Sequence, residues 1–366
     1  MKKNLKSYDN LFNLSAMSVH RNAIYGFAAL WIVAFHLVDM MSKVNATFPT
    51  SLRFFWDTFK LGNIGVDVFL FLSGVGLYYS FSKDGHVLRF YYKRLIRILV
   101  PFALICLPYL IYLFAVGRMS QEVFIQNITF VNYWLGNTSP INLWYIPAIL
   151  VLYLIYPLLY KIIFFSKKGA LARCLVLAAI SIAVTFTLFA IFGTAKDGLY
   201  KRWDTFLPRV TTFIIGCWFG KPVKEKKGFS PWLLLGSLVV LAGAYPLYAQ
   251  SILQGPYNRY YGCLTGIALV FILSQFFELF KNIGLDKFFA FFGAFSLEIY
   301  LIHIEARNWY MSSELFAGRH FYRDYAVLAV CAIAAAYVVS LIEKPLINLL
   351  MKPLKEKKKE KRIKNN

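Results

Sequence analysis

The chain has 366 residues, of which 59% are hydrophobic and 16% are charged, whereas roughly a quarter of the residues in a soluble domain are charged. With a mean hydropathy of +0.55, this composition excludes an ordinary soluble protein. The formal net charge of +22 does not favour a nucleic-acid partner, because the Lys and Arg residues concentrate at the ends of apolar segments. Membrane topology and anionic lipid headgroups account for them better.

The apolar segments have the length of membrane spans. A bilayer core requires about 20 apolar residues per helix, and this chain has room for about ten such helices with short connections. We therefore predict an all-α membrane protein, a bundle of about ten transmembrane helices. The predicted spans are residues 22–41, 61–81, 98–116, 143–165, 171–193, 206–220, 231–250, 260–281, 287–305 and 325–349.

The distribution of basic residues predicts the orientation of the bundle. With the N-terminus inside, about 28 of the 40 Lys and Arg residues lie on the inner side. Both termini are therefore expected in the cytoplasm, and the expected location is the plasma membrane. The predicted membrane domain covers residues 1–350, and a basic cytoplasmic tail covers residues 351–366.

The cysteines do not predict a metal centre. Their spacing fits neither a zinc site nor a disulfide framework, and we expect no metal. The five cysteines are Cys106, Cys174, Cys217, Cys263 and Cys331.

The first predicted span contains two ionisable residues. Counted from Arg21 at the inner edge, His36 lies roughly 22 Å along the helix, in the outer half of the bilayer. Asp39 follows three residues later on the same face, where its carboxylate can orient the imidazole. A histidine at this depth is either catalytic or structural, and the span by itself does not decide between them.

The second predicted span contains Asp67 among several glycines. Small residues in a membrane helix allow close helix packing, and we assign the glycines to that role. An isolated carboxylate in lipid is costly, so Asp67 is a candidate functional residue.

Just before the third span, at its inner end, two arginines lie three residues apart on one helical face, Arg94 and Arg97. Two guanidiniums arranged in this way bind phosphate well. Anchoring of the helix at the inner membrane surface explains the same pattern equally well.

Two further segments place polar and aromatic residues at the predicted outer side. Trp144 and Tyr145 open the fourth span, as residues of an aromatic belt commonly do. In the ninth span Ser296, Tyr300 and His303 form one polar stripe. Such a stripe lines either a helix contact or a cavity.

Taken together, these segments resemble the type 3 family of membrane acyltransferases, which O-acetylate extracellular and cell-surface polysaccharides. The resemblance covers nearly the whole chain, and it depends on six pieces in the same order rather than on any one of them. The pieces are FH (35–36), GVDVFLFLSG (65–74), KRLIRILVP (93–101), LWYIPAIL (143–150), SLEIYLIH (296–303) and EKPL (343–346).

The resemblance implies a ten-helix bundle that uses cytoplasmic acetyl-CoA to modify an acceptor outside. His36 matches the essential histidine of the family, and Arg94 and Arg97 match its Arg-x-x-Arg pair, which is thought to bind the acyl donor. One departure concerns an arginine that the family usually places eleven residues before the histidine. That position is Tyr25 here, and Arg21, one turn earlier, is our candidate replacement.

These assignments suggest a mechanism in which His36 acts as a general base on a sugar hydroxyl or carries the acetyl group itself. Asp67 or Asp39 would stabilise the imidazolium. Acceptor-binding candidates are Trp144, Tyr145, Tyr300 and His303.

Two other functions fit the sequence. A transporter or flippase for a glycan or lipid-linked oligosaccharide would also line its pathway with polar residues, although no inverted repeat is visible. The second alternative function is an acyltransferase that uses a succinyl donor or modifies a small-molecule acceptor. The sequence predicts neither the acceptor nor the oligomeric state.

Overall fold

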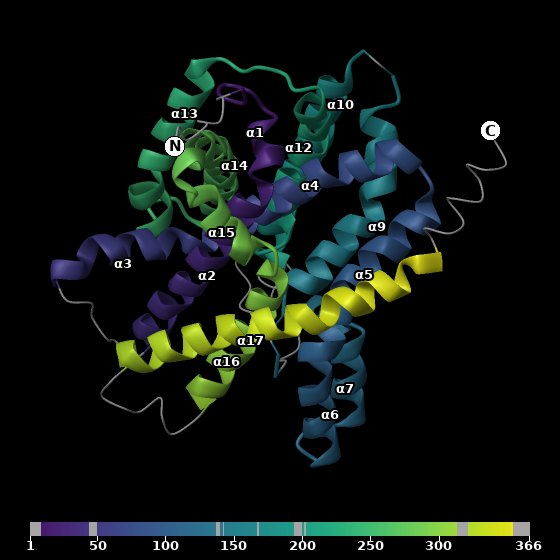
Figure 1. The fold of residues 1–366 in the computed structure, drawn as a ribbon, viewed down its shortest axis with the longest axis vertical. Coiled ribbons are helices and arrows are strands. Elements are labelled where there is room, and N and C mark those ends of the chain that lie inside the picture. Colours follow the sequence, from purple (N-terminus) through teal and green to yellow (C-terminus); the bar gives the residue numbers. More distant parts are fainter. Residues whose placement is uncertain are drawn as a thin grey trace, which may run out of the picture. The chain divides into compact units, whose positions relative to one another are not determined.

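The computed structural model describes residues 9–43, 50–136, 140–141, 143–166, 168–193, 200, 203–312 and 321–353. Within these ranges every regular element is a helix, which confirms the all-α prediction (Figure 1). The chain divides into two compact units, unit 1 with Met1–Lys83 and Tyr156–Ser296, and unit 2 with Asp84–Ile155 and Leu297–Asn366. The predicted basic tail lies outside the described residues from residue 354 onward.

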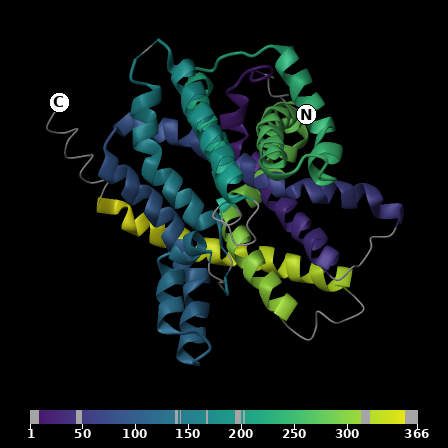
Figure 2. The ribbon, with the colours of Figure 1, turned by 180° about the vertical axis from the view of Figure 1, so that it is seen from behind.

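Unit 1 is built around helices α2, α4 and α14. Fully buried apolar side chains from each of them, such as Ile24, Phe71 and Phe277, meet in one core. Helices α13 and α14 also pack against each other (Figure 2). The helices of unit 1 are α1 (Ala16–Val19), α2 (Arg21–Lys43), α3 (Arg53–Lys60), α4 (Gly65–Asp84), α10 (Ala170–Phe192), α12 (Leu207–Lys224), α13 (Pro231–Ala242), α14 (Gly255–Phe280) and α15 (Leu285–Gly293), with short turns at Thr50–Leu52, Leu61–Ile64, Tyr245–Ala249 and Lys281–Ile283.

Glycines allow two pairs of helices in unit 1 to approach closely. Where α2 meets α15, a Cβ at Gly26 would overlap the carbonyl oxygen of Phe289 (Figure 1). On α4, a Cβ at Gly74 would lie 2.7 Å from the backbone nitrogen of Cys217 in α12. Gly74 therefore has the packing role that we predicted for the glycines of the second span.

Unit 2 contains two long helices and a short helical hairpin. Phe114 of α6 stacks on Phe124 of α7 with ring centroids 5.1 Å apart, and Tyr92 of α5 donates a 2.9 Å hydrogen bond to the carbonyl oxygen of Leu350 in α17. The division between the units falls within α9 (Tyr145–Ile163). The other helices of unit 2 are α5 (Val87–Ile105), α6 (Leu107–Ala115), α7 (Gln121–Ile128), α8 (Val131–Leu135), α16 (Ser296–Ser312) and α17 (Phe321–Leu350).

The predicted spans correspond to helices, but two of them are bent. Among the described residues, seven helices are long and apolar enough to cross a membrane, or up to nine if each bent pair is one span. The third predicted span covers the end of α5 and α6, which meet at 44°, and the ninth covers parts of α15 and α16. Pro108 is the second residue of α6, and its missing N–H interrupts the backbone hydrogen bonding there.

The sixth predicted span, residues 206–220, is helix α12, which is not among these candidates. Three cations, Arg209, Lys221 and Lys224, lie within its 18 residues. Most of its side chains are buried inside unit 1, so α12 differs from a lipid-facing helix. The count of ten spans therefore stays a prediction.

Other helices expose broad apolar surfaces. On α10, Leu175, Ile180 and Ile191 are each more than half exposed, and on α17 the same holds for Val330 and Ile342. A soluble protein rarely exposes apolar patches of this kind, whereas a bilayer covers them.

Candidate functional site

Helix α2 carries both ionisable residues of the first predicted span. His36 and Asp39 are each half-buried and lie three residues apart on one continuous helix, which places them on the same side. The imidazole of His36 packs edge-on against the Phe35 ring, with centroids 5.2 Å apart. A partly accessible imidazole next to a carboxylate can accept a proton from a bound hydroxyl.

The other end of α2 carries Arg21 beside a polar cavity of about 270 Å³ in unit 1. Its guanidinium lies over the ring of Tyr25, 5.5 Å from the centroid, so the candidate replacement contacts the residue that stands where the family usually has an arginine. No carboxylate among the described residues pairs with Arg21 within 4 Å. Gly76 of α4 leaves room for it, since a Cβ there would lie 2.7 Å from Nη1.

A buried ionic cluster stands next to this cavity, and our sequence interpretation missed it. His20 Nε2 lies 2.8 Å from the Glu278 carboxylate, and His20 Nδ1 lies 3.7 Å from Asp286, which also lines the cavity. Lys281 pairs with Glu278 at 2.6 Å. These contacts hold the start of α2 against α14 and α15, and so they position Arg21.

Asp67 has a partner that we did not predict. Arg209 Nη2 donates to its Oδ2 at 3.2 Å, and the Cys263 thiol donates to its Oδ1 at 3.3 Å. Asp67 and Arg209 are both almost completely buried in unit 1. Among the described residues the hydrogen bonds of Asp67 go to these two groups and not to His36, so Asp39 is the better candidate to orient the imidazole.

The signal for Arg209 was present in the sequence. We selected Asp67 because it is an ionisable residue inside an apolar segment. The same rule applies to Arg209, which lies in the sixth predicted span.

Unit 2 brings the predicted acceptor-binding residues together. The Tyr145 backbone N–H donates to Tyr300 Oη at 3.4 Å, and their rings pack edge-on at 5.4 Å. Trp144 lies edge-on to Tyr145 at 6.2 Å, and His303 lies 6.0 Å from the Tyr300 ring. His303 Nδ1 lies 2.7 Å from the carbonyl oxygen of Ile299, an arrangement in which Nδ1 donates and Nε2 is the acceptor.

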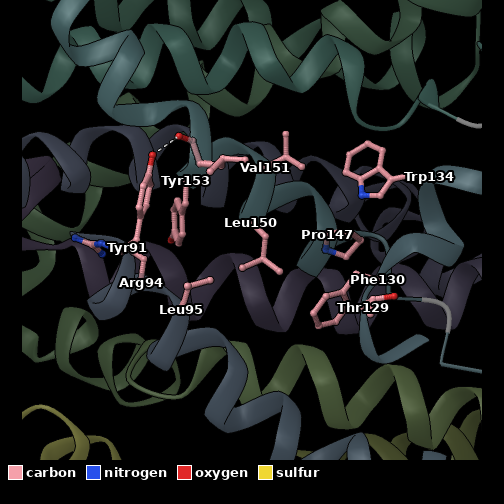
Figure 3. Close-up of a pocket in the computed structure, with 11 residues that line it drawn as sticks. Tyr91, Arg94, Leu95, Thr129, Phe130, Trp134, Pro147, Leu150, Val151 and Tyr153 are labelled. Carbon is pink, nitrogen blue, oxygen red and sulfur yellow. Dashed lines mark hydrogen bonds between the residues drawn. The ribbon is translucent and has the colours of Figure 1, made fainter. Parts of the chain in front are cut away.

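The two arginines of α5 have different surroundings. Arg97 is exposed. Arg94 is half-buried, and its guanidinium lies over the rings of Phe90 and Tyr153 at 5.7 and 5.9 Å. Arg94 also lines a cavity of about 350 Å³ whose other walls are largely apolar and aromatic (Figure 3). The two guanidiniums therefore differ in burial and in their aromatic neighbours, and their binding of donor phosphate stays a prediction.

No group of three or more His, Cys, Asp or Glu side chains that could hold a metal ion occurs in the part of the chain that the structure describes.

Comparison with known proteins identifies the family. The model of the acyltransferase 3 family, described as an acyltransferase domain, matches residues 22–342 and thus nearly the whole chain. The chain belongs to this family, and with its apolar helices it is a multi-pass membrane acyltransferase. No curated protein and no solved structure matches the chain.

Proposed function

We propose that this protein transfers an acetyl group from cytoplasmic acetyl-CoA to a hydroxyl group of a cell-surface or exported polysaccharide at the plasma membrane. The observation that carries the proposal is the layout of α2. Arg21 borders a polar cavity at one end, and His36 follows 15 residues later, about 22 Å along the same helix. That separation is comparable to an extended pantetheine arm.

In this proposal the phosphates of the donor bind Arg21, and the thioester reaches His36. The imidazole removes the proton of the acceptor hydroxyl, whose oxygen attacks the thioester carbonyl. The carbon–sulfur bond breaks, and the CoA sulfur takes up the proton that the imidazole held. Asp39 stabilises the imidazolium, and the aromatic group around Tyr300 holds the acceptor sugar. On the motif alone, Arg94 and Arg97 are further donor contacts.

The reaction itself is tested with acetyl-CoA carrying a labelled acetyl group. Membranes containing the protein should transfer the label to polysaccharide, in a bond that mild alkali cleaves as it does an ester. Membranes with a His36→Ala variant at the same expression level should not. A flippase would leave the label on CoA, and a succinyl-specific enzyme would transfer label only from succinyl-CoA, so either result would contradict the proposal.

Replacing Arg21 should weaken donor binding more than catalysis. We expect Arg21→Gln to raise KM for acetyl-CoA about ten- to hundredfold, because a charge-assisted contact to phosphate contributes about 1.5–3 kcal/mol. Gly76→Ala should act in the same direction, since its methyl group displaces the guanidinium. Steady-state kinetics on purified protein measure both effects.

Two further variants separate a donor site from a structural role of Arg21. Arg53→Gln removes a cation that is 74% exposed and should leave KM unchanged. The double variant Arg21→Gln/Tyr25→Arg restores the usual family arrangement and should recover donor affinity. An unchanged KM in Arg21→Gln would assign this arginine to membrane anchoring.

A further inference from the structure

The polar cavity of unit 1 has walls of opposite charge, and the proposed function uses only one of them. The cavity is lined by residues 18–23 at the start of α2 and by Asp286 and Ala290 of α15. Arg21 supplies a cation to one wall, and Asp286 supplies a carboxylate to the other. A phosphate against Asp286 would be repelled. A ligand that fills the cavity must therefore present an anion to Arg21 and a hydrogen-bond donor to Asp286.

The Asp286 carboxylate has no hydrogen-bond donor within the described part of the chain. Its Oδ1 is buried without a partner, and its Oδ2 lies 3.7 Å from His20 Nδ1, which is an ion-pair distance rather than a hydrogen bond. The other ring nitrogen of His20 faces Glu278 at 2.8 Å. A carboxylate that is only 19% exposed is costly to leave without donors. Asp286 therefore suits a donor group on a bound ligand.

The position of Asp286 indicates which part of acetyl-CoA meets it. His20 lies directly before α2, where its carbonyl oxygen accepts from the Ile24 N–H at 2.9 Å. Asp286 stands beside His20, so it lies beyond Arg21 when seen from His36. In the proposed function the phosphates bind Arg21, and the pantetheine arm runs towards His36. The part of the donor on the other side of the phosphates is the adenosine.

Adenine carries the donor group that Asp286 lacks. Its exocyclic amino group donates hydrogen bonds, and carboxylates accept from the amino groups of bases in nucleic-acid recognition. A cavity of about 270 Å³ is slightly smaller than most small-molecule sites, so it suits one part of the donor rather than the whole.

We propose that Asp286 accepts a hydrogen bond from the adenine amino group of the acyl donor. The inference rests on the proposed function, because it extends the same donor site. Its consequence is donor selection. The protein uses an acyl-CoA in preference to an acyl group carried on phosphopantetheine alone, as on a carrier protein, because only the acyl-CoA has the adenine that Asp286 binds.

Isothermal calorimetry on the full-length protein in detergent tests this contact without any turnover. The probes are CoA, deamino-CoA, in which an oxygen replaces the adenine amino group, and 4′-phosphopantetheine, which has no nucleoside. The wild type should bind CoA about ten- to hundredfold more tightly than deamino-CoA, the usual contribution of a hydrogen bond to a charged group. It should bind 4′-phosphopantetheine no more tightly than deamino-CoA.

The variant Asp286→Asn gives a readout that a structural role of Asp286 would not change. Its amide can donate to the oxygen of deamino-CoA and accept from the amino group of CoA, so it should bind both equally well. Arg21→Gln should weaken both by the same factor, because both carry the same phosphates. As a control, Asp57→Asn removes a carboxylate of similar exposure, 26%, and should keep the wild-type preference.

Equal affinity of the wild type for CoA and deamino-CoA overturns the adenine contact and leaves acetyl-CoA as the proposed donor. An unchanged preference in Asp286→Asn, or a preference lost in Asp57→Asn, overturns it in the same way. A wild type that binds none of the three probes contradicts the donor of the proposed function as well. The wild-type comparison decides the question even if Asp286→Asn does not fold.

Discussion

His36→Ala should lower the rate of acetyl transfer about 100- to 10,000-fold, the usual contribution of a general acid–base residue. The imidazole is half-buried and lies near Asp39 on α2, so the variant removes the only group that we assign to proton transfer. Binding of acetyl-CoA should persist, because the proposed phosphate contact lies about 22 Å away at Arg21. Single-turnover measurements with labelled donor give the rate, and isothermal calorimetry gives the affinity.

The control for this variant is His86→Ala. His86 is exposed at the start of α5, and its side chain does not cap the helix, so its loss should leave the rate unchanged. His36→Gln retains a side chain that forms hydrogen bonds but cannot act as a base, and it should be as slow as His36→Ala. A wild-type rate of acetyl transfer in either His36 variant would contradict the role of His36 as general base.

Removing one partner of the Asp67–Arg209 pair should destabilise the protein by about 3–5 kcal/mol, the usual consequence of leaving a buried charge unpaired. Both side chains are at most 4% exposed, and they join α4 to α12 inside unit 1. We therefore expect Arg209→Met to lower the free energy of unfolding by that amount. Equilibrium unfolding in mixed micelles containing dodecyl sulfate measures the loss.

A second ion pair in the same unit provides the comparison. Arg259 and Asp204 lie 2.7 Å apart but are 28% and 27% exposed, so Arg259→Met should cost at most about 1 kcal/mol. The double variant Asp67→Leu/Arg209→Met leaves no unpaired charge and should recover most of the lost stability. Equal losses for Arg209→Met and Arg259→Met would contradict the importance that we give to burial.

The candidate site residues could be selected from the sequence because their signals are local. An ionisable residue in an apolar segment is visible without any knowledge of the fold, and this rule selected both His36 and Asp67. The stripe of Tyr300 and His303 follows from helical periodicity, and the structure packs these residues beside Tyr145. The partner of Asp67 could not be predicted in this way, because Arg209 is 142 residues further along the chain.

The sequence alone determined the membrane class, the positions of the helices and the resemblance to one enzyme family. It could do so because hydropathy and motif order are properties of consecutive residues. Tertiary structure decided which charges neutralise each other, that α12 is buried within unit 1, and that Arg94 and Arg97 have different surroundings. These features depend on which helices pack together. Packing among segments far apart in the chain is set by the shapes of many side chains at once, and no short window of sequence contains that information.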